Sequence, residues 1–202
     1  MLPTGFVYVR DVIPSVCEDI RYAGSHNFMG RPADGYAAPH AVITCEAAKA
    51  LSQAAEHFAN QGYKLLLYDG YRPQRAVDHF ARWAADESDI LAKAEFYPTL
   101  DKSELFPRGY IALRSGHSRG STIDLTLLQS DGTPLDMGGE FDWFSPISAH
   151  AYKGLTALQK ANRLLLKKGM EEAGFAPYSE EWWHYGLKNE PYPDTYFDFV
   201  IE

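Results

Sequence analysis

Apolar residues recur along the chain at the two spacings that distinguish helices from strands. A helix is expected at residues 45–60, where four apolar residues share one helical face: Ala47, Leu51, Ala54 and Phe58. Thr44 is its candidate N-cap, and Gly62 ends it. The apolar run at residues 63–68 is typical of a short buried strand.

Two further helices are expected from helical spacing of apolar residues and from residues typical of helix ends. Pro73 suits the first position of the second helix, whose apolar residues recur at helical spacing: Ala76, Val77, Phe80 and Trp83. The third is expected from Leu155 to about Ala173, with Gly174 as its C-terminal cap. Arg72 therefore lies at a junction between a strand and a helix, where functional side chains are often displayed.

Two strands are expected in the middle of the chain, after an irregular excursion at residues 85–107. Residues 110–114 form one of them, and the strictly alternating residues 123–127 form the other. Asp124 shares one face of the second strand with Thr126, while apolar residues occupy the opposite face. Helices interspersed with short strands predict the α+β class.

Length and composition indicate one folded domain spanning residues 1–202, because neither a repeat nor a long linker interrupts the chain. A hydrophobic fraction of 46% provides for a sizeable core. The net charge of −8 argues against a nucleic-acid partner, since such binding depends on basic residues that neutralise phosphates. Cys17 and Cys45 form no CxxC pair, which indicates ordinary thiols.

The sequence as given predicts a cytoplasmic protein without a membrane segment. Its amino end has no basic segment leading into an apolar run of about 7–15 residues, and no later stretch approaches a membrane span. A periplasmic protein whose export signal had been removed would give the same pattern. The sequence leaves open whether the chain forms a homo-oligomer.

His117 and Asp124 are the first candidates for chemistry. They are joined by a loop with two glycines, which can fold the imidazole back over the strand that carries the carboxylate. A hydrogen-bonded structural pair is the ordinary interpretation of this spacing. The position of Asp124 among apolar neighbours favours a metal site, because a carboxylate there needs a cation or hydrogen bonds to compensate its burial.

Glu181 and His184 form a second candidate pair, among Trp182, Trp183 and Tyr185. Alone, the segment is better explained as an aromatic core with a satisfied histidine. Together the two pairs offer a catalytic zinc three nitrogen or oxygen ligands, an open position for water and a nearby carboxylate. Both Glu181 and His184 can reach one ion only if the two tryptophans lie in a turn or a distorted strand.

Arg72 is the third candidate. Hydrolysis of an amide develops negative charge on the carbonyl oxygen, and a guanidinium placed there stabilises the transition state more than the ground state. A surface or capping arginine is the alternative interpretation.

Three segments combine these candidates: residues 68–73 (YDGYRP), 115–127 (SGHSRGSTIDLTL) and 181–185 (EWWHY). Their order and spacing, with the ending at residues 190–199, make the chain similar to the VanX-type D-alanyl-D-alanine dipeptidases of the zinc DD-peptidase and Hedgehog superfamily. The resemblance implies a central, mainly antiparallel sheet flanked by helices. It also implies hydrolysis of the dipeptide D-alanyl-D-alanine to free D-alanine.

The resemblance assigns roles to the candidate residues. His117, Asp124 and His184 would bind one zinc ion per chain. Glu181 would act as the catalytic base, and Arg72 would steady the tetrahedral intermediate.

Three further residues are implied as substrate-binding. Tyr22 and Asp142 match positions at the amino end of the dipeptide, and Ser115 matches one near its carboxylate. Thr122 and Gly116 depart from the family, which commonly has Ala and Ser there. These departures are expected to alter rate or pocket shape without removing a metal ligand.

Two alternatives remain at this point: a D,D- or L,D-carboxypeptidase acting on longer peptidoglycan peptides, and a zinc-binding module without catalysis. The sequence also does not distinguish two biological roles for a dipeptidase. One is depletion of a cell-wall precursor, as in vancomycin resistance, and the other is recovery of D-alanine from peptidoglycan turnover.

Overall fold

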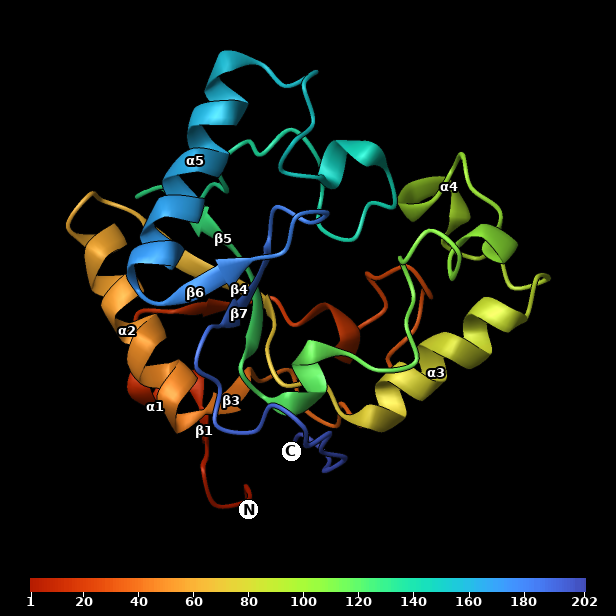
Figure 1. Cartoon of the computed structure of the whole chain (residues 1–202), viewed down its shortest axis with the longest axis horizontal. Helices are drawn as coiled ribbons and strands as arrows, with labels where there is room; N and C mark the ends of the chain where they lie inside the picture. Colours follow the sequence, from red (N-terminus) through yellow and green to blue (C-terminus); the bar gives the residue numbers. More distant parts are fainter.

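A five-stranded sheet with the order β2-β4-β5-β7-β6 forms the centre of the computed structural model, which describes residues 1–202 (Figure 1). In chain order its strands are β2 (Cys17–Glu18), β4 (Lys64–Asp69), β5 (Thr122–Leu128), β6 (Phe175–Pro177) and β7 (His184–Leu187). Only β2 and β4 pair in parallel, and the other neighbours are antiparallel. The predicted α+β class with a mainly antiparallel sheet is confirmed.

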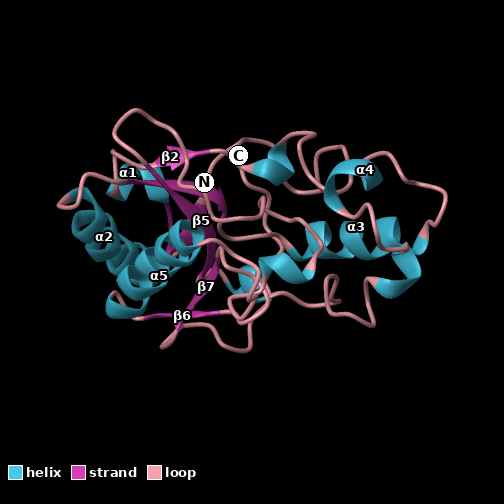
Figure 2. Cartoon of the chain, turned by 90° about the horizontal axis from the view of Figure 1, so that it is seen from above, coloured by secondary structure: helices cyan, strands magenta, loops and turns pink.

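Helices cover both sides of this sheet (Figure 2). On one side lie α1 (Val9–Val12), α2 (Cys45–Ala59) and α5 (Ala157–Glu172), and on the other lie α3 (Gln74–Ala85) and α4 (Lys93–Phe96). Three long helices thus occupy the three predicted regions. None of the helices has the length and apolar character needed to cross a membrane.

Local chemistry explains where α2 and α5 begin and how they pack. Thr44 Oγ1 accepts a hydrogen bond from the Ala47 backbone N–H, which confirms the predicted N-cap. Thr156 caps α5 in the same way, so this helix begins two residues later than predicted. Gly169 of α5 lies against Phe58 of α2, where an added Cβ would come within 2.3 Å of the phenyl ring. Close packing of the two helices therefore depends on this glycine.

The segment that follows α3 is tied to its end by Lys102. The ammonium group of this buried lysine donates hydrogen bonds to the carbonyls of Trp83 and Asp86 at 2.7 and 2.8 Å. It thereby satisfies groups that the last turn of a helix leaves without partners. The segment also contains a short 3₁₀ helix, η2 (Lys102–Glu104).

The strand predicted at residues 110–114 is wrong, because these residues form bends with no neighbouring strand. The backbone N–H groups of Tyr110 and Ile111 donate instead to the Leu105 carbonyl. Ile111 is buried while Leu113 is 69% exposed. Tyr110, Ile111 and Ala112 form part of a pocket wall rather than one face of a sheet.

A second, two-stranded sheet of β1 (Phe6–Tyr8) and β3 (Val42–Thr44) lies beside the first. The last ten residues run back across the molecule toward α3 and the loop before β5. There the Phe197 backbone N–H donates to the Ser118 carbonyl, and the Gln74 N–H donates to the Phe197 carbonyl. The carboxyl end of the chain thus supports the loop that carries His117.

The strand register brings three polar residues into one row. Asp124 of β5 is paired with Asp69 of β4 on one side and with His184 of β7 on the other. An irregularity between Leu67 and Asp69 shifts the β4 register just before this row. All seven residues of β5 are buried, so the polar face predicted for this strand also points into protein.

Candidate active site

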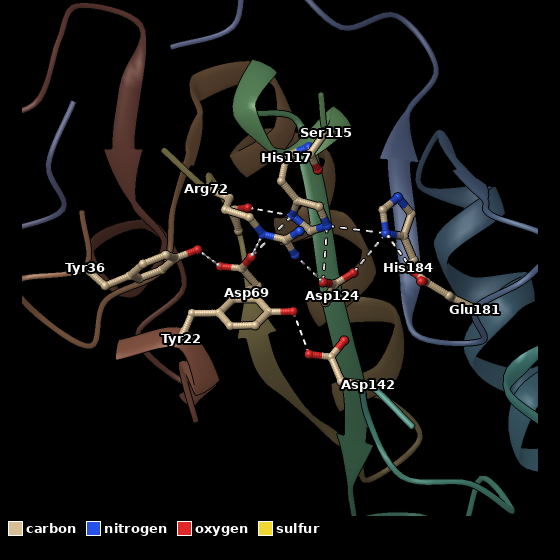
Figure 3. A network of polar contacts seen from close by, with 11 residues as sticks. Tyr22, Tyr36, Asp69, Arg72, Ser115, His117, Asp124, Asp142, Glu181 and His184 are labelled. Carbon is tan, nitrogen blue, oxygen red and sulfur yellow. Dashed lines mark hydrogen bonds and ion pairs between the residues drawn. The ribbon is translucent and has the colours of Figure 1, made fainter. Parts of the chain in front are cut away.

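Three side chains from separate elements converge at one end of β5. His117 comes from the 3₁₀ helix η3 (Gly116–Arg119), Asp124 from β5 and His184 from the first position of β7. One atom of each lies within 4.8 Å of the others, and Figure 3 shows the three groups facing one another. Asp124 Oδ2 is 3.2 Å from His117 Nε2, and Asp124 Oδ1 is 3.2 Å from His184 Nδ1. The predicted ligand set therefore forms one compact cluster.

The backbone fixes the orientation of the His117 ring. Its Nδ1 donates a hydrogen bond to the Gly70 carbonyl at 2.7 Å, since a carbonyl oxygen can only accept. In the neutral ring the lone pair then lies on Nε2, which faces the cluster. Ser115 Oγ accepts from the His117 backbone N–H at 3.2 Å. Gly120 ends the loop at φ 83°, where a side chain would be strained and would meet Phe6 at 2.3 Å.

The charges of the cluster fit a cation. Asp124 is 2% exposed, and its Oδ1 accepts no hydrogen bond. Burial would raise the pKa of this carboxyl, but His117 and His184 outweigh burial and hold the pKa well below its usual range. Burial lowers the pKa of His184, yet Asp124 and Glu181 raise it to about 9. These two pKa shifts mean that the cluster favours bound positive charge, such as a proton. A divalent metal ion also supplies positive charge, and nitrogen and oxygen atoms like these are its usual ligands.

Glu181 lies beside this cluster, with its Oε2 atom 3.3 Å from His184 Nδ1. Trp182 and Trp183 form a turn directly before β7, in which the His184 N–H approaches the Glu181 carbonyl at 3.4 Å. The predicted irregularity of this segment is confirmed. Both tryptophans are buried, which anchors the turn and directs Glu181 and His184 toward one point.

Arg72 reaches the cluster from the junction of β4 and α3. Its Nε donates to Asp69 Oδ2 at 2.9 Å, and its Nη2 donates to Asp124 Oδ2 at 3.4 Å. The guanidinium also lies 4.7 Å from the centre of the Tyr22 ring. With only 12% of its side chain exposed, Arg72 is not a surface arginine.

The sequence prediction missed two residues behind Arg72. Asp69 is fully buried and accepts a second hydrogen bond from the Tyr36 hydroxyl at 2.7 Å. Burial raises the pKa of Asp69, while Arg72 and His117 act in the opposite direction. Asp69 stands at the end of a predicted strand, within residues 68–73 (YDGYRP), and this position could have indicated a role in the site. Tyr36 comes from a distant loop and carries no such signal.

All eight predicted site residues line one cavity of about 290 Å³: Tyr22, Arg72, Ser115, His117, Asp124, Asp142, Glu181 and His184. Apolar side chains supply much of the remaining wall, among them Phe28, Phe80 and Phe144. Ligand pockets span about 300–1,000 Å³, so the volume of this cavity lies just below the lower end of that range. The cavity has room for a small molecule next to the cluster of His117, Asp124 and His184.

A buried carboxyl group lies at the opposite side of the cavity from Ser115 (Figure 3). Asp142 Oδ2 accepts a hydrogen bond from the Tyr22 hydroxyl at 2.6 Å. Asp142 is the one residue other than glycine with a positive φ, at 58°. Burial raises the pKa of this carboxyl well above its usual range, so a cationic ligand would stabilise its ionised form. Strained backbone and buried charge of this kind are typical of ligand sites.

The two departures from the resembled family touch each other. A Cβ added to Gly116 would lie 2.9 Å from Thr122 Oγ1, closer than such contacts normally occur. A small residue at position 116 therefore accommodates a large one at position 122. Both positions border the His117 loop, and neither replaces a residue of the metal-binding cluster.

Comparison with known proteins gives one consistent result. Residues 3–202 match the D-ala-D-ala dipeptidase family Peptidase_M15. The chain is 46% identical to a D-alanyl-D-alanine dipeptidase of Enterococcus faecium, over 98% of both chains. It is 48% identical to one of Streptomyces coelicolor, over 97% of this chain and 98% of that one. A solved structure of VanYB in complex with D-alanine-D-alanine is more distant, at 12% identity over 76% of each chain and a TM-score of 0.46. By its sequence over nearly its whole length, the chain belongs to the D-Ala-D-Ala dipeptidase family of metallopeptidases.

Proposed function

We propose that this chain hydrolyses D-alanyl-D-alanine with one zinc ion held by His117, Asp124 and His184. The observation that carries the proposal is the compact cluster of two imidazoles and one carboxylate, which includes a buried oxygen without a hydrogen bond. Three such ligands with a fourth position left for water are the pattern of catalytic zinc. The family and the dipeptidases similar to this chain support the same activity.

Zinc bound there would polarise the scissile carbonyl and lower the pKa of a water molecule to about 7. Glu181 is placed to act as the general base. Its carboxylate lies 3.3 Å from a ligand nitrogen and a quarter of its side chain is exposed, so it can exchange protons within the cavity. It takes a proton from the attacking water and delivers it to the leaving amine.

Arg72 stabilises the carbonyl oxygen as negative charge develops on it. Asp69 fixes Nε of the guanidinium, and Nη2 points toward Asp124 at the centre of the cluster. A cation held in place before the reaction needs no reorganisation as the charge appears, which is the basis of oxyanion stabilisation. Because Arg72 is buried, this charge acts with little screening by water.

The two sides of the cavity match the two ends of a free dipeptide. Asp142, supported by Tyr22, receives the ammonium group, and Ser115 offers its hydroxyl to the carboxylate. The scissile bond then lies beside the cluster between them. A cavity of about 290 Å³ with the buried Asp142 in its wall leaves little room for a peptide extended at its amino end. This geometry favours a dipeptidase over a carboxypeptidase that acts on longer peptides.

The proposal is tested with the zinc-loaded protein and three substrates: D-alanyl-D-alanine, its N-acetyl derivative and a peptidoglycan pentapeptide ending in the same two residues. We expect release of D-alanine from the free dipeptide and at least 100-fold lower kcat/KM for the other two, because they lack the ammonium next to Asp142. Similar rates on the dipeptide and the pentapeptide would overturn the dipeptidase assignment in favour of a carboxypeptidase.

The metal is tested by elemental analysis of the same preparation. About one zinc per chain, with activity lost on chelation and regained on adding zinc, is the expected result. A zinc-replete protein that cleaves none of the three substrates would support a binding module without catalysis.

A further inference from the structure

The carboxylate end of the proposed substrate lacks a counter-charge among the residues described so far. Ser115 is the only group assigned there, and its Oγ already accepts a hydrogen bond from the His117 backbone N–H. The hydroxyl can donate one hydrogen bond but carries no charge. Three carboxyl groups line the cavity, from Asp124, Asp142 and Glu181. An anionic group that enters this cavity therefore needs a cation near Ser115.

Two arginines line the cavity, and only one is already paired. Arg72 lies within 4.0 Å of the carboxylates of both Asp69 and Asp124. Arg114 directly precedes Ser115, is exposed to solvent and forms no ion pair within the protein. The neighbouring Arg119 is engaged by Glu190 at 2.9 Å. Arg114 is thus the cavity-lining cation that remains free to bind an anion.

The guanidinium of Arg114 is also held in position. It lies 4.8 Å from the centre of the Tyr196 ring, in a cation–π contact. Tyr196 belongs to the carboxyl-terminal segment, which a hydrogen bond from the Phe197 N–H to the Ser118 carbonyl holds against the His117 loop. Stacking on an aromatic ring restricts an otherwise flexible side chain, so less entropy is lost when its N–H groups bind a ligand.

We propose that Arg114 binds the carboxylate of the dipeptide substrate, together with the hydroxyl of Ser115. This inference rests on the proposed function. The planar guanidinium can donate two parallel hydrogen bonds to a carboxylate, a geometry that a hydroxyl cannot supply. Asp142 then binds the ammonium group and Arg114 the carboxylate at the opposite end of the same substrate. The distance between Asp142 and Arg114 selects the length of the substrate.

The role of Arg114 is tested with Arg114→Gln and two substrates, D-alanyl-D-alanine and D-alanyl-D-alanine amide, which lacks the carboxylate charge. For the dipeptide we expect KM to rise about 10- to 100-fold, as for loss of a charge-assisted hydrogen bond, with kcat changed less than about threefold. For the amide, KM should change less than about threefold. Arg114→Lys should recover part of the affinity, because it retains the charge but loses the planar pair of donors.

Arg82→Gln is the matched control, since Arg82 lies on α3 outside the cavity and pairs with Asp34. This variant should leave KM and kcat unchanged for both substrates. Raising the ionic strength should increase KM of the wild-type protein for the dipeptide and have a smaller effect on Arg114→Gln. Equal KM changes for dipeptide and amide, or none for either, would overturn the assignment. Hydrolysis of the dipeptide by the wild-type protein is measured first, so failure of the proposed function is recognised independently.

Discussion

Gly116→Ser should destabilise the loop that carries His117, and Thr122→Ala should relieve the effect. A Cβ at position 116 would lie 2.9 Å from Thr122 Oγ1 and 3.5 Å from Arg119 Nη2. Thr122 is 3% exposed and branched at Cβ, so its side chain has little freedom to rotate away from position 116. Overpacking of this kind costs about 1–3 kcal/mol. For a chain of this length each kcal/mol lowers Tm by about 2–4 °C, so we expect a fall of about 2–12 °C.

The reasoning is tested by a double-mutant cycle. Thr122→Ala alone should cost about 1 kcal/mol for lost packing, and it makes room for a side chain at position 116. The double variant should therefore be more stable than the sum of the single effects by about 1–2 kcal/mol. Thermal unfolding measured with bound zinc gives the stabilities, and kcat on D-alanyl-D-alanine reports any displacement of His117. Additivity within about 0.5 kcal/mol would refute the idea that the two departures compensate each other.

Four further variants test other parts of the site. Asp69→Asn should lower kcat and Tm, because it removes the carboxylate that holds Arg72. In an Arg72→Ala background the same substitution should raise Tm, because it then removes an unpaired buried charge. A lower Tm in both backgrounds would contradict this. Arg72→Ala should lower kcat about 100- to 1,000-fold with little change in KM, whereas a loss confined to KM would place Arg72 in ground-state binding. Glu181→Ala should retain zinc and lose about 100- to 10,000-fold in kcat, and near-normal kcat with full zinc content would exclude the base assignment. His150→Leu should reduce the loss of Tm between pH 7 and pH 5. Burial, followed by the charges of Lys167 and Arg163, lowers the pKa of His150 from 6.5 to about 4, so the unfolded chain takes up a proton first as pH falls through this window. An unchanged pH dependence would refute this.

Local signals were sufficient to predict the three long helices and to place their starting points within two residues. Thr44 caps α2, and Pro73 immediately precedes α3, because hydroxyl caps and proline at a first turn act within a few residues of sequence. The prediction of a strand at residues 110–114 was wrong because a strand does not depend on local sequence alone. A strand requires a partner, and no neighbouring strand pairs with this segment. Ile111 and Leu113 would share one face of a strand, but Ile111 is buried and Leu113 is exposed, which a half-buried strand does not produce.

Much of the candidate site was predictable because several of its residues carried their own signals. Asp124 was a carboxylate among apolar residues, and Glu181 with His184 stood in an aromatic segment that needed a turn. What the sequence did not provide is the register that sets Asp69 beside Asp124, since this depends on a local irregularity in β4. Tyr36 was missed for a related reason, because only the folded chain brings its hydroxyl to Asp69.

In the proposed binding mode, selectivity for a free dipeptide follows from the cost of burying Asp142 as much as from attraction to the substrate. Burial and the nearby Asp124 raise the pKa of this carboxyl, and the hydrogen bond from Tyr22 offsets only part of the effect. An ammonium group supplies the missing countercharge, so a free dipeptide restores the ionised form. An acylated amino end supplies no charge and would leave Asp142 either protonated or uncompensated. Discrimination by such a penalty is stronger than discrimination by added contacts, because the rejected ligand leaves a buried polar group without a partner.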